Sequence, residues 1–156
     1  MKKIGIIGLG NPLQKDDGIG ILLLEKLSQI KEELPENIEL IDGGTGGMNL
    51  LHDLPRFDMI LIIDAVNLNQ RPGTTKLFDI NDIVSKKMSL GNSTHESDFT
   101  KIIQLSKKLN EAPDKIFVFG VQPKDVSFDQ KLSIDLTEKL DSIFEDLVCK
   151  IRDISQ

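Results

Sequence analysis

The sequence predicts an α/β fold, a three-layer sandwich in which a mostly parallel sheet of about five strands lies between helices. Short apolar runs alternate with longer stretches whose apolar residues recur every three or four positions, which is typical of alternating strands and helices. Residues 59–63 are five successive apolar residues, as in a parallel strand buried on both faces. The 156 residues are the usual size of one domain, so we expect a single domain over residues 1–156.

The first half of the chain predicts two strand, loop and helix units. Residues 3–9 are rich in β-branched residues and run into the turn-forming segment Gly10-Asn11-Pro12, which indicates a strand and its end. A helix follows, with apolar positions at Ile19, Leu22, Leu23, Leu27 and Ile30. Residues 37–41 predict a second strand and residues 48–53 a short helix, with a glycine-rich loop between them.

The second half adds strands and helices that continue the alternation. The predicted strands are residues 59–63, 74–78 and 115–119, and the predicted helices are residues 99–109 and 136–151. The polar segment 81–94 gives no strong signal for either. Cys149 falls in the pattern of the last helix, where we expect a buried or half-buried thiol.

Composition excludes several classes of function. The formal net charge of −6 is opposite in sign to the basic surface that nucleic-acid binding needs, so we expect no nucleic-acid partner. Nowhere does an apolar run reach the roughly 18 residues of a membrane-spanning helix. A single cysteine cannot form an internal disulfide, which fits a reducing compartment. The sequence thus indicates a cytoplasmic protein without a membrane partner.

Polar and glycine-rich segments follow four of the predicted strands. They contain Asn11, then Asp42, Gly43, Gly44, Thr45, Gly46 and Gly47, then Asp64, and finally Gln122. In open α/β sheets, ligands bind outside the carboxyl ends of the strands, so we expect these segments to form the active site. The glycine run is either a tight turn or a surface that another backbone can approach closely.

Three residues near this edge are the candidate catalytic residues and metal ligands. Asp17 begins the first helix, Asp64 directly follows the central strand, and His95 lies in the loop before the helix predicted at residues 99–109. Two carboxylates and an imidazole suit a divalent ion such as nickel or zinc, with positions left open for water or a substrate. The same groups can instead polarise a carbonyl or activate water. Asp16 is either a capping residue or shares the role of Asp17.

Each candidate also has a plain structural interpretation. Asp17 can be a carboxylate that interacts with the helix dipole, and His95 a solvated loop histidine. Asp64 is harder to explain in this way, because a carboxylate after a buried run costs free energy unless it is partnered or near solvent. His52, the other histidine, is expected at the surface.

Other familiar chemistry fits the sequence less well. Gly8 and Gly10 stand between a strand and a helix, as in a dinucleotide-binding turn, but Leu13 occupies the place of the third glycine or alanine. A nucleotide-binding α/β domain is therefore a less favoured alternative. The chain contains neither the H-E-x-x-H pair of zinc proteases nor the G-x-S-x-G elbow of serine hydrolases.

Five segments, in this order along the chain, resemble the hydrogenase maturation endopeptidases. They are Gly8-Leu9-Gly10-Asn11-Pro12 with Asp16-Asp17-Gly18-Ile19-Gly20, Asp42-Gly43-Gly44-Thr45-Gly46-Gly47-Met48, Asp64-Ala65, Ser93-Thr94-His95 and Gly120-Val121-Gln122-Pro123. The resemblance implies a protease that removes the C-terminal extension of a nickel-iron hydrogenase large-subunit precursor after nickel insertion. It also implies that Asp17, Asp64 and His95 contact nickel that the precursor supplies, and other divalent ions can occupy the same ligands.

Two points stay open beside this resemblance. The family often has a glycine before the Leu132-Ser133 pair, whereas here Asp129, Gln130 and Lys131 precede it, so substrate preference cannot be carried over for this loop. A non-catalytic, metal-sensing assembly protein for the same precursor would use the same three ligands. That protein is the alternative to the endopeptidase.

Overall fold

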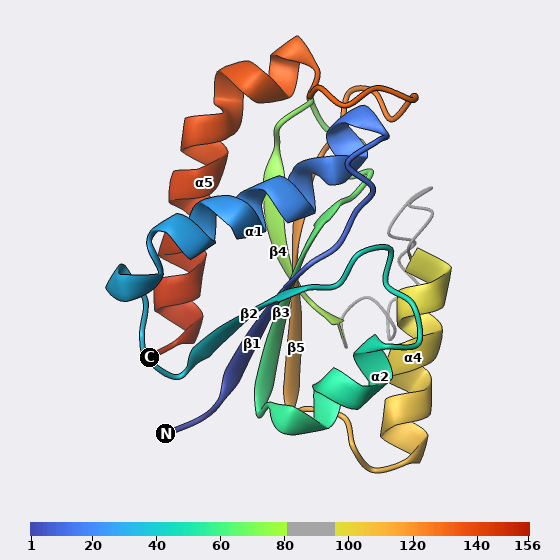
Figure 1. Ribbon diagram of the computed structural model, residues 1–156, viewed down its shortest axis with the longest axis vertical. Coiled ribbons are helices and arrows are strands. Elements are labelled where there is room, and N and C mark those ends of the chain that lie inside the picture. The colour runs from blue at the N-terminus through green and yellow to red at the C-terminus, as the bar shows by residue number, and fades with distance from the viewer. Residues whose placement is uncertain (81–95) are drawn as a thin grey trace.

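The structure is a computed structural model that describes residues 1–80 and 96–156, without the side chains of residues 96–100. It has one sheet with helices on both faces (Figure 1). The strands are β1 (Ile4–Gly8), β2 (Ile38–Asp42), β3 (Met59–Ala65), β4 (Thr75–Asp79) and β5 (Lys115–Val121). The helices are α1 (Ile19–Gln29), α2 (Leu50–Asp53), α4 (Glu96–Lys108) and α5 (Ile134–Ile154), and the 3-10 turns are η1 (Lys15–Gly18), η2 (Lys31–Glu33) and η3 (Leu54–Arg56).

The five strands lie in the order β2-β1-β3-β5-β4. β1 pairs in parallel with β2 and β3, and β3 pairs in parallel with β5. β4 is the exception, because it runs antiparallel to β5 at the edge of the sheet. The predicted α/β architecture, with a mostly parallel sheet of about five strands between helices, is confirmed.

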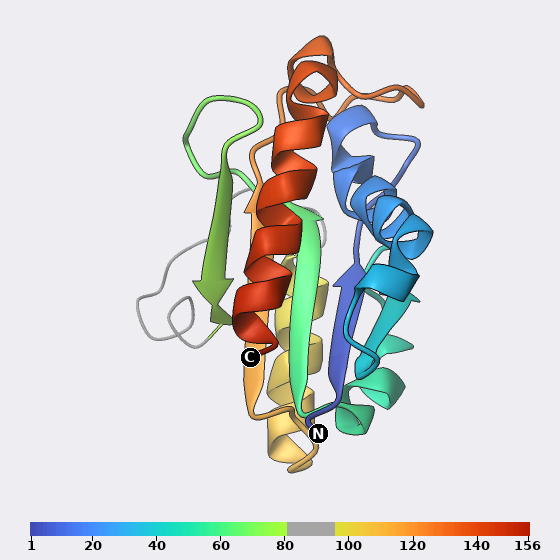
Figure 2. The ribbon, with the colours of Figure 1, turned by 90° about the vertical axis from the view of Figure 1, so that its left-hand side faces the viewer.

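Two apolar cores hold the layers together, one on each face of the sheet. In Figure 2, α1 and α5 lie in front of the sheet and α4 lies behind it. All seven residues of β3 are buried, and they alternate between the two cores. Leu61 and Ile63 pack with α1 and α5, whereas Ile60 and Ile62 pack with α2 and α4. This alternation explains why residues 59–63 of the strand are apolar at every position, as the sequence predicted.

β3 extends further than its apolar run. The prediction ended the strand at Ile63, but it continues through Asp64 and Ala65, which pair with Gly120 and Val121 of β5. Asp64 is therefore held by the sheet itself. A side chain on a paired strand has far less freedom than one in a loop.

The first turn of α1 lies tightly against the ends of two strands. A Cβ atom on Gly20 would lie 2.2 Å from the carbonyl oxygen of Leu9 and 2.3 Å from that of Ile63. Only glycine allows this approach. The close packing fixes the start of α1, and with it the preceding turn η1, beside the carboxyl end of β3.

Two expectations about single segments have different outcomes. Cys149 is exposed, so the expectation of a buried or half-buried thiol is wrong. It lies two residues from the buried Leu147 and Ile151, a rotation of about 200°, which carries it away from the packed face of α5. The polar segment 81–94 lies outside the described residues. Within residues 1–80 and 96–156, no helix is both long enough and apolar enough to cross a membrane.

Candidate functional site

The register of the sheet brings the predicted site segments to one edge. Gly8, the last residue of β1, pairs with Asp42 of β2 and with Ile63 of β3. The segments that follow β1 and β2 therefore leave the sheet at the same level, just before Asp64 in the neighbouring β3 (Figure 1). The predicted gathering of these polar and glycine-rich segments at the carboxyl ends agrees with this register.

Asp64 is a buried carboxylate within the sheet. Its exposed fraction is 7%, and its Oδ1 accepts a hydrogen bond of 2.9 Å from the backbone N–H of Ala65. It follows Ile60 and Ile62 at two-residue spacing and so shares their face of the sheet, the side of α2 and α4. A carboxylate in such surroundings needs polar or cationic partners to remain ionised.

Asp17 supplies a second buried carboxylate from a different element. It belongs to η1, its exposed fraction is 5%, and its Oδ2 accepts a hydrogen bond of 3.0 Å from the backbone N–H of Asn11. This bond ties the loop after β1 to η1. Because η1 contacts β3, Asp17 and Asp64 lie on neighbouring elements at the same edge of the sheet.

Asp16 has partners quite different from those of Asp17. It is fully buried, and its Oδ2 accepts hydrogen bonds from the backbone N–H groups of Lys124 (2.8 Å) and Asp125 (3.0 Å) and from the Ser133 hydroxyl (2.8 Å). Its Oδ1 accepts one from the Ser133 backbone N–H (2.8 Å). Asp16 thus anchors both ends of the loop between β5 and α5 to η1. The sequence left its role open between capping and metal contact, and these bonds favour a structural role.

An ion pair supports the same anchor at the surface. Lys15 Nζ lies 3.0 Å from Asp125 Oδ2. The pKa of the Asp125 carboxyl is lowered to about 2, first by the backbone N–H and side chain of Ser127 and then by Lys15. The hydrogen bond to Asp125 raises the pKa of Lys15. Both groups therefore carry their charges throughout the neutral range.

Gln122, predicted in the substrate-binding edge, orders the loop after β3. Its exposed fraction is 8%, and its Oε1 accepts hydrogen bonds from the backbone N–H groups of Leu68 and Gln70. Its Nε2 donates to Asn67 Oδ1 at 3.3 Å and to the carbonyl oxygen of Pro123 at 3.2 Å. The side-chain amide joins the loop after β3 to the loop after β5.

The glycine-rich loop after β2 is tightly packed at Gly43 and has free space around Gly47. The side chain of Asp42 accepts a hydrogen bond from the Gly44 N–H (2.9 Å), and a Cβ on Gly43 would lie 2.6 Å from the side chain of Leu9. No described atom lies within 4 Å of a Cβ built on Gly47, whose backbone is not in the left-handed region. Packing thus explains glycine at position 43, but nothing in the described chain requires it at position 47.

His95, the third predicted ligand, lies outside the described residues. In the part of the chain that the structure describes, no three His, Cys, Asp or Glu side chains form a group that could hold a metal ion. Asp17 and Asp64 are the two predicted ligands that can be placed. The other histidine, His52, is exposed in α2, as expected.

The sequence prediction found the carboxylates but missed the anchor formed by Asp16 and Ser133. Ser133 carries one local signal, because Ser is a preferred N-cap residue and its side chain here accepts from the Leu136 N–H at the start of α5. Nothing local links it to Asp16, which lies 117 residues away. Only the folded topology brings the two together.

Comparisons with known proteins agree with this fold. The family model described as hydrogenase maturation protease (HycI) matches residues 21–154. HupD of Thiocapsa roseopersicina, a hydrogenase expression/formation protein, is 30% identical over 92% of this chain and 65% of its own length. The coenzyme F420 hydrogenase subunit delta of Methanothermobacter thermautotrophicus is 33% identical over 80% of this chain and 77% of its own length.

Solved structures show the same architecture. The hydrogenase maturating endopeptidase HybD from E. coli superposes with a TM-score of 0.83 at 27% identity, over 97% of this chain and 93% of that one. The chain spans 64% and 65% of the lengths of two curated relatives, HupD of Bradyrhizobium diazoefficiens and of T. roseopersicina. The family match covers most of the chain and includes Asp64 and His95. The chain belongs to the hydrogenase maturation protease family.

Proposed function

We propose that the protein is an endopeptidase that removes the C-terminal extension of a nickel-iron hydrogenase large-subunit precursor after nickel insertion. In this proposal, Asp17, Asp64 and His95 recognise the nickel. One observation carries it: two carboxylates, each more than nine-tenths buried, come from η1 and β3 to the same edge of the sheet. Membership of the hydrogenase maturation protease family supports the same activity.

Buried carboxylates at this edge suit recognition of a cation. Burial of an ionised carboxylate is unfavourable unless a counter-charge or hydrogen-bond donors compensate for the lost water. Nickel held in the precursor adds a cation beside these carboxylates when the precursor binds. Carboxylate and imidazole ligands both bind divalent first-row ions. The nickel is part of the substrate here, so an empty precursor would lack the group that docks it.

Docking by the metal brings the scissile bond to a defined place. In peptide hydrolysis, the oxygen of water bonds to the carbonyl carbon, the C–N bond breaks and the departing amine takes up a proton. A fixed carboxylate near the bond can first accept the proton of the water. Placing water, carboxylate and peptide in one geometry lowers the entropic part of the barrier. The sheet position of Asp64 supplies the required rigidity.

The glycine-rich loop gives the precursor tail a place to bind. No described atom lies within 4 Å of a Cβ atom built on Gly44 or Gly47, so this part of the loop is open. A peptide backbone can approach such a loop more closely than it can approach ordinary side chains. Asp42 holds the start of the loop at the same edge as Asp64. We therefore place the extended tail along residues 43–47.

A purified two-component reaction tests the proposal. The protein is incubated with nickel-loaded or nickel-free precursor, and the products are weighed by mass spectrometry. We expect a shortened precursor and a released C-terminal peptide only with nickel, and no cleavage by Asp17→Asn, Asp64→Asn or His95→Ala. Asp153→Asn, an exposed carboxylate on α5, is the matched control and should cleave normally.

Two results would decide against the proposal. Undiminished cleavage by all three site variants would show that these side chains are not required for cleavage. A stable complex that forms without release of any peptide would instead identify a non-catalytic assembly protein.

A further inference from the structure

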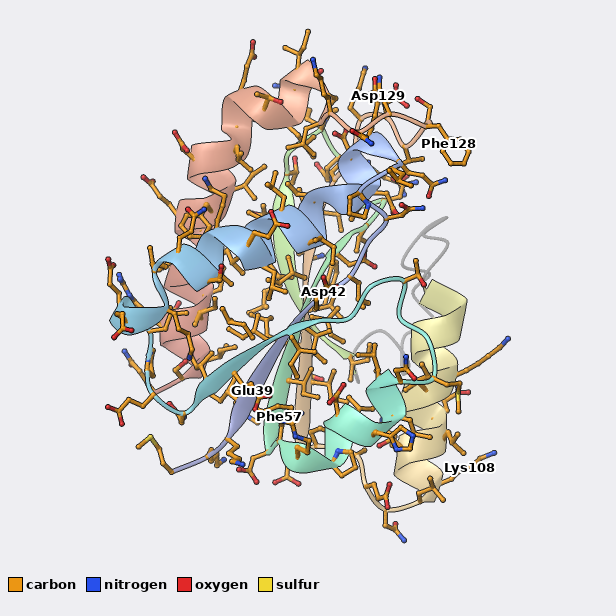
Figure 3. All side chains as sticks on the ribbon, in the orientation of Figure 1. Glu39, Asp42, Phe57, Lys108, Phe128 and Asp129 are labelled. Carbon is orange, nitrogen blue, oxygen red and sulfur yellow. The ribbon has the colours of Figure 1, made fainter. Side chains whose placement is uncertain are left out.

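Exposed apolar side chains lie on the chain segments that are hydrogen-bonded to η1 and to the loop before it. Of the seven large apolar side chains that are exposed in the described residues, one belongs to the loop before η1, two to the segment between β5 and α5, and one to the first position of α5. These four are Leu13 (52% exposed), Val126 (48%), Phe128 (82%) and Ile134 (76%), and we call them the Phe128 surface. Figure 3 shows Phe128 at the outer end of its loop, pointing away from the rest of the chain.

Backbone hydrogen bonds join the two segments that form this surface. The N–H of Asp129, next to Phe128, donates to the carbonyl oxygen of Leu13 at 2.9 Å. The N–H of Lys15 donates in return to the carbonyl oxygen of Asp129 at 2.8 Å, and that of Asp16 to Asp125 at 3.1 Å. Leu13 and Phe128 therefore belong to neighbouring, paired stretches of backbone.

The buried Asp16 carboxylate holds this surface in a fixed position. It binds Lys124 and Asp125 at one end of the loop and Ser133, the neighbour of Ile134, at the other. Asp17 is the next residue along the chain, so the turn η1 holds both this surface and the candidate site. The apolar side chains are thus held out into solvent by the same bonds that order η1.

Charged side chains surround this surface, because Lys124, Asp129 and Lys131 are exposed in the same loop. Lys15 and Asp125 lie beside it but form an ion pair with each other. Clustered apolar side chains on an ordered surface are typical of protein–protein contacts, and an aromatic residue at the centre is a frequent anchor. A free peptide tail bound along residues 43–47 would not need such a surface.

We propose that the Phe128 surface binds an apolar patch on the folded body of the hydrogenase precursor while its tail occupies the candidate site. This inference rests on the proposed function and adds a second contact to it. The precursor is the occupant because the surface is continuous with η1, which carries Asp17. A protein whose tail reaches Asp17 must place its body close to this loop.

Steady-state kinetics with nickel-loaded, full-length precursor test the inference. The variants are Leu13→Ser, Phe128→Ser and the two combined. Leu109→Ser is the matched control, because Leu109 is 51% exposed beyond the end of α4 whereas Leu13 is 52% exposed. We expect the double variant to raise KM by about tenfold or more, with kcat and the melting temperature unchanged and with no effect of the control.

The possible failures are distinguishable. If wild-type protein does not cleave the precursor, the proposed function fails and this inference falls with it. If wild-type protein cleaves and the double variant has an unchanged KM, the inference alone is wrong. Sedimentation of the protein without precursor adds a further check: wild-type dimers that become monomers in the double variant would show that a second copy covers this surface, and would also overturn it.

Discussion

The carboxylate of Asp16 accepts hydrogen bonds from both the backbone N–H and the hydroxyl of Ser133, although the two residues lie 117 positions apart. The two bonds are each 2.8 Å long and join the turn before α1 to the first turn of α5. They attach the start of α5 to η1, the turn that also contains the predicted nickel ligand Asp17. Stability and site geometry are therefore linked through this contact.

Replacement of Asp16 by asparagine should destabilise the fold. An amide nitrogen would face N–H donors that now find a carboxylate oxygen, and a buried carboxylate that accepts several hydrogen bonds would be lost. We expect the free energy of unfolding to fall by about 2–4 kcal/mol, as measured by urea denaturation. Ser133→Ala keeps the backbone bond and should cost only about 1 kcal/mol. Equal losses for the two variants would contradict this account.

The ion pair between Lys15 and Asp125 should persist in acid to well below pH 4. The pKa of Asp125 is about 2 in the folded protein, below its ordinary value of 3.8, so its contribution to stability is complete above pH 3.8 and is lost as the pH falls through 2. A carbon-detected NMR titration of the carboxyl group should give a midpoint near 2. Lys15→Ala should raise the midpoint only in part, because the hydrogen bonds from Ser127 are the larger cause. A wild-type midpoint at the ordinary value would refute the described geometry.

Two glycine substitutions should have opposite effects on folding. Gly43→Ala places a Cβ atom 2.6 Å from Leu9 and 2.7 Å from Ile7, so it should lower the melting temperature. Gly47→Ala meets no described atom within 4 Å and should leave stability unchanged or raise it by about 0.5 kcal/mol. If the precursor tail lies along this loop, Gly47→Ala should nevertheless raise KM for the precursor. A normal KM would mean that the tail binds elsewhere.

Free metal ions offer a test that does not require the precursor. Calorimetric titration with nickel ions should show weak binding to wild-type protein. Asp64→Asn or His95→Ala should reduce the affinity by at least about tenfold, because each removes a proposed ligand. Asp153→Asn should bind nickel like the wild type. Identical affinities for all four proteins would place any bound nickel outside the proposed ligands.

Local patterns were enough to predict most of the architecture. The five apolar residues of 59–63 identified the central strand, because a strand buried on both faces cannot alternate with polar residues. The apolar spacing around Ile143 and Leu147 identified α5. Pattern alone did not reveal that β4 runs antiparallel, since strand direction depends on the connection and not on the strand's own residues.

The candidate site was predictable only in part. Asp17 and Asp64 stood out because carboxylates beside buried strands need a reason to be there. The anchor on Asp16 depends on contacts across the whole chain, and no local signal identifies such a partner. Cys149 shows the related limit that a residue near an apolar helix face can still point away from it.

Three of the four donors to Asp16 are main-chain amides, so this attachment is indifferent to which side chains stand at 124 and 125. The backbone of Asp129 is held in the same way, by main-chain hydrogen bonds to Leu13 and Lys15. The side chains of residues 126–132 can therefore be exchanged while the backbone path of this loop, and its attachment to η1, are kept.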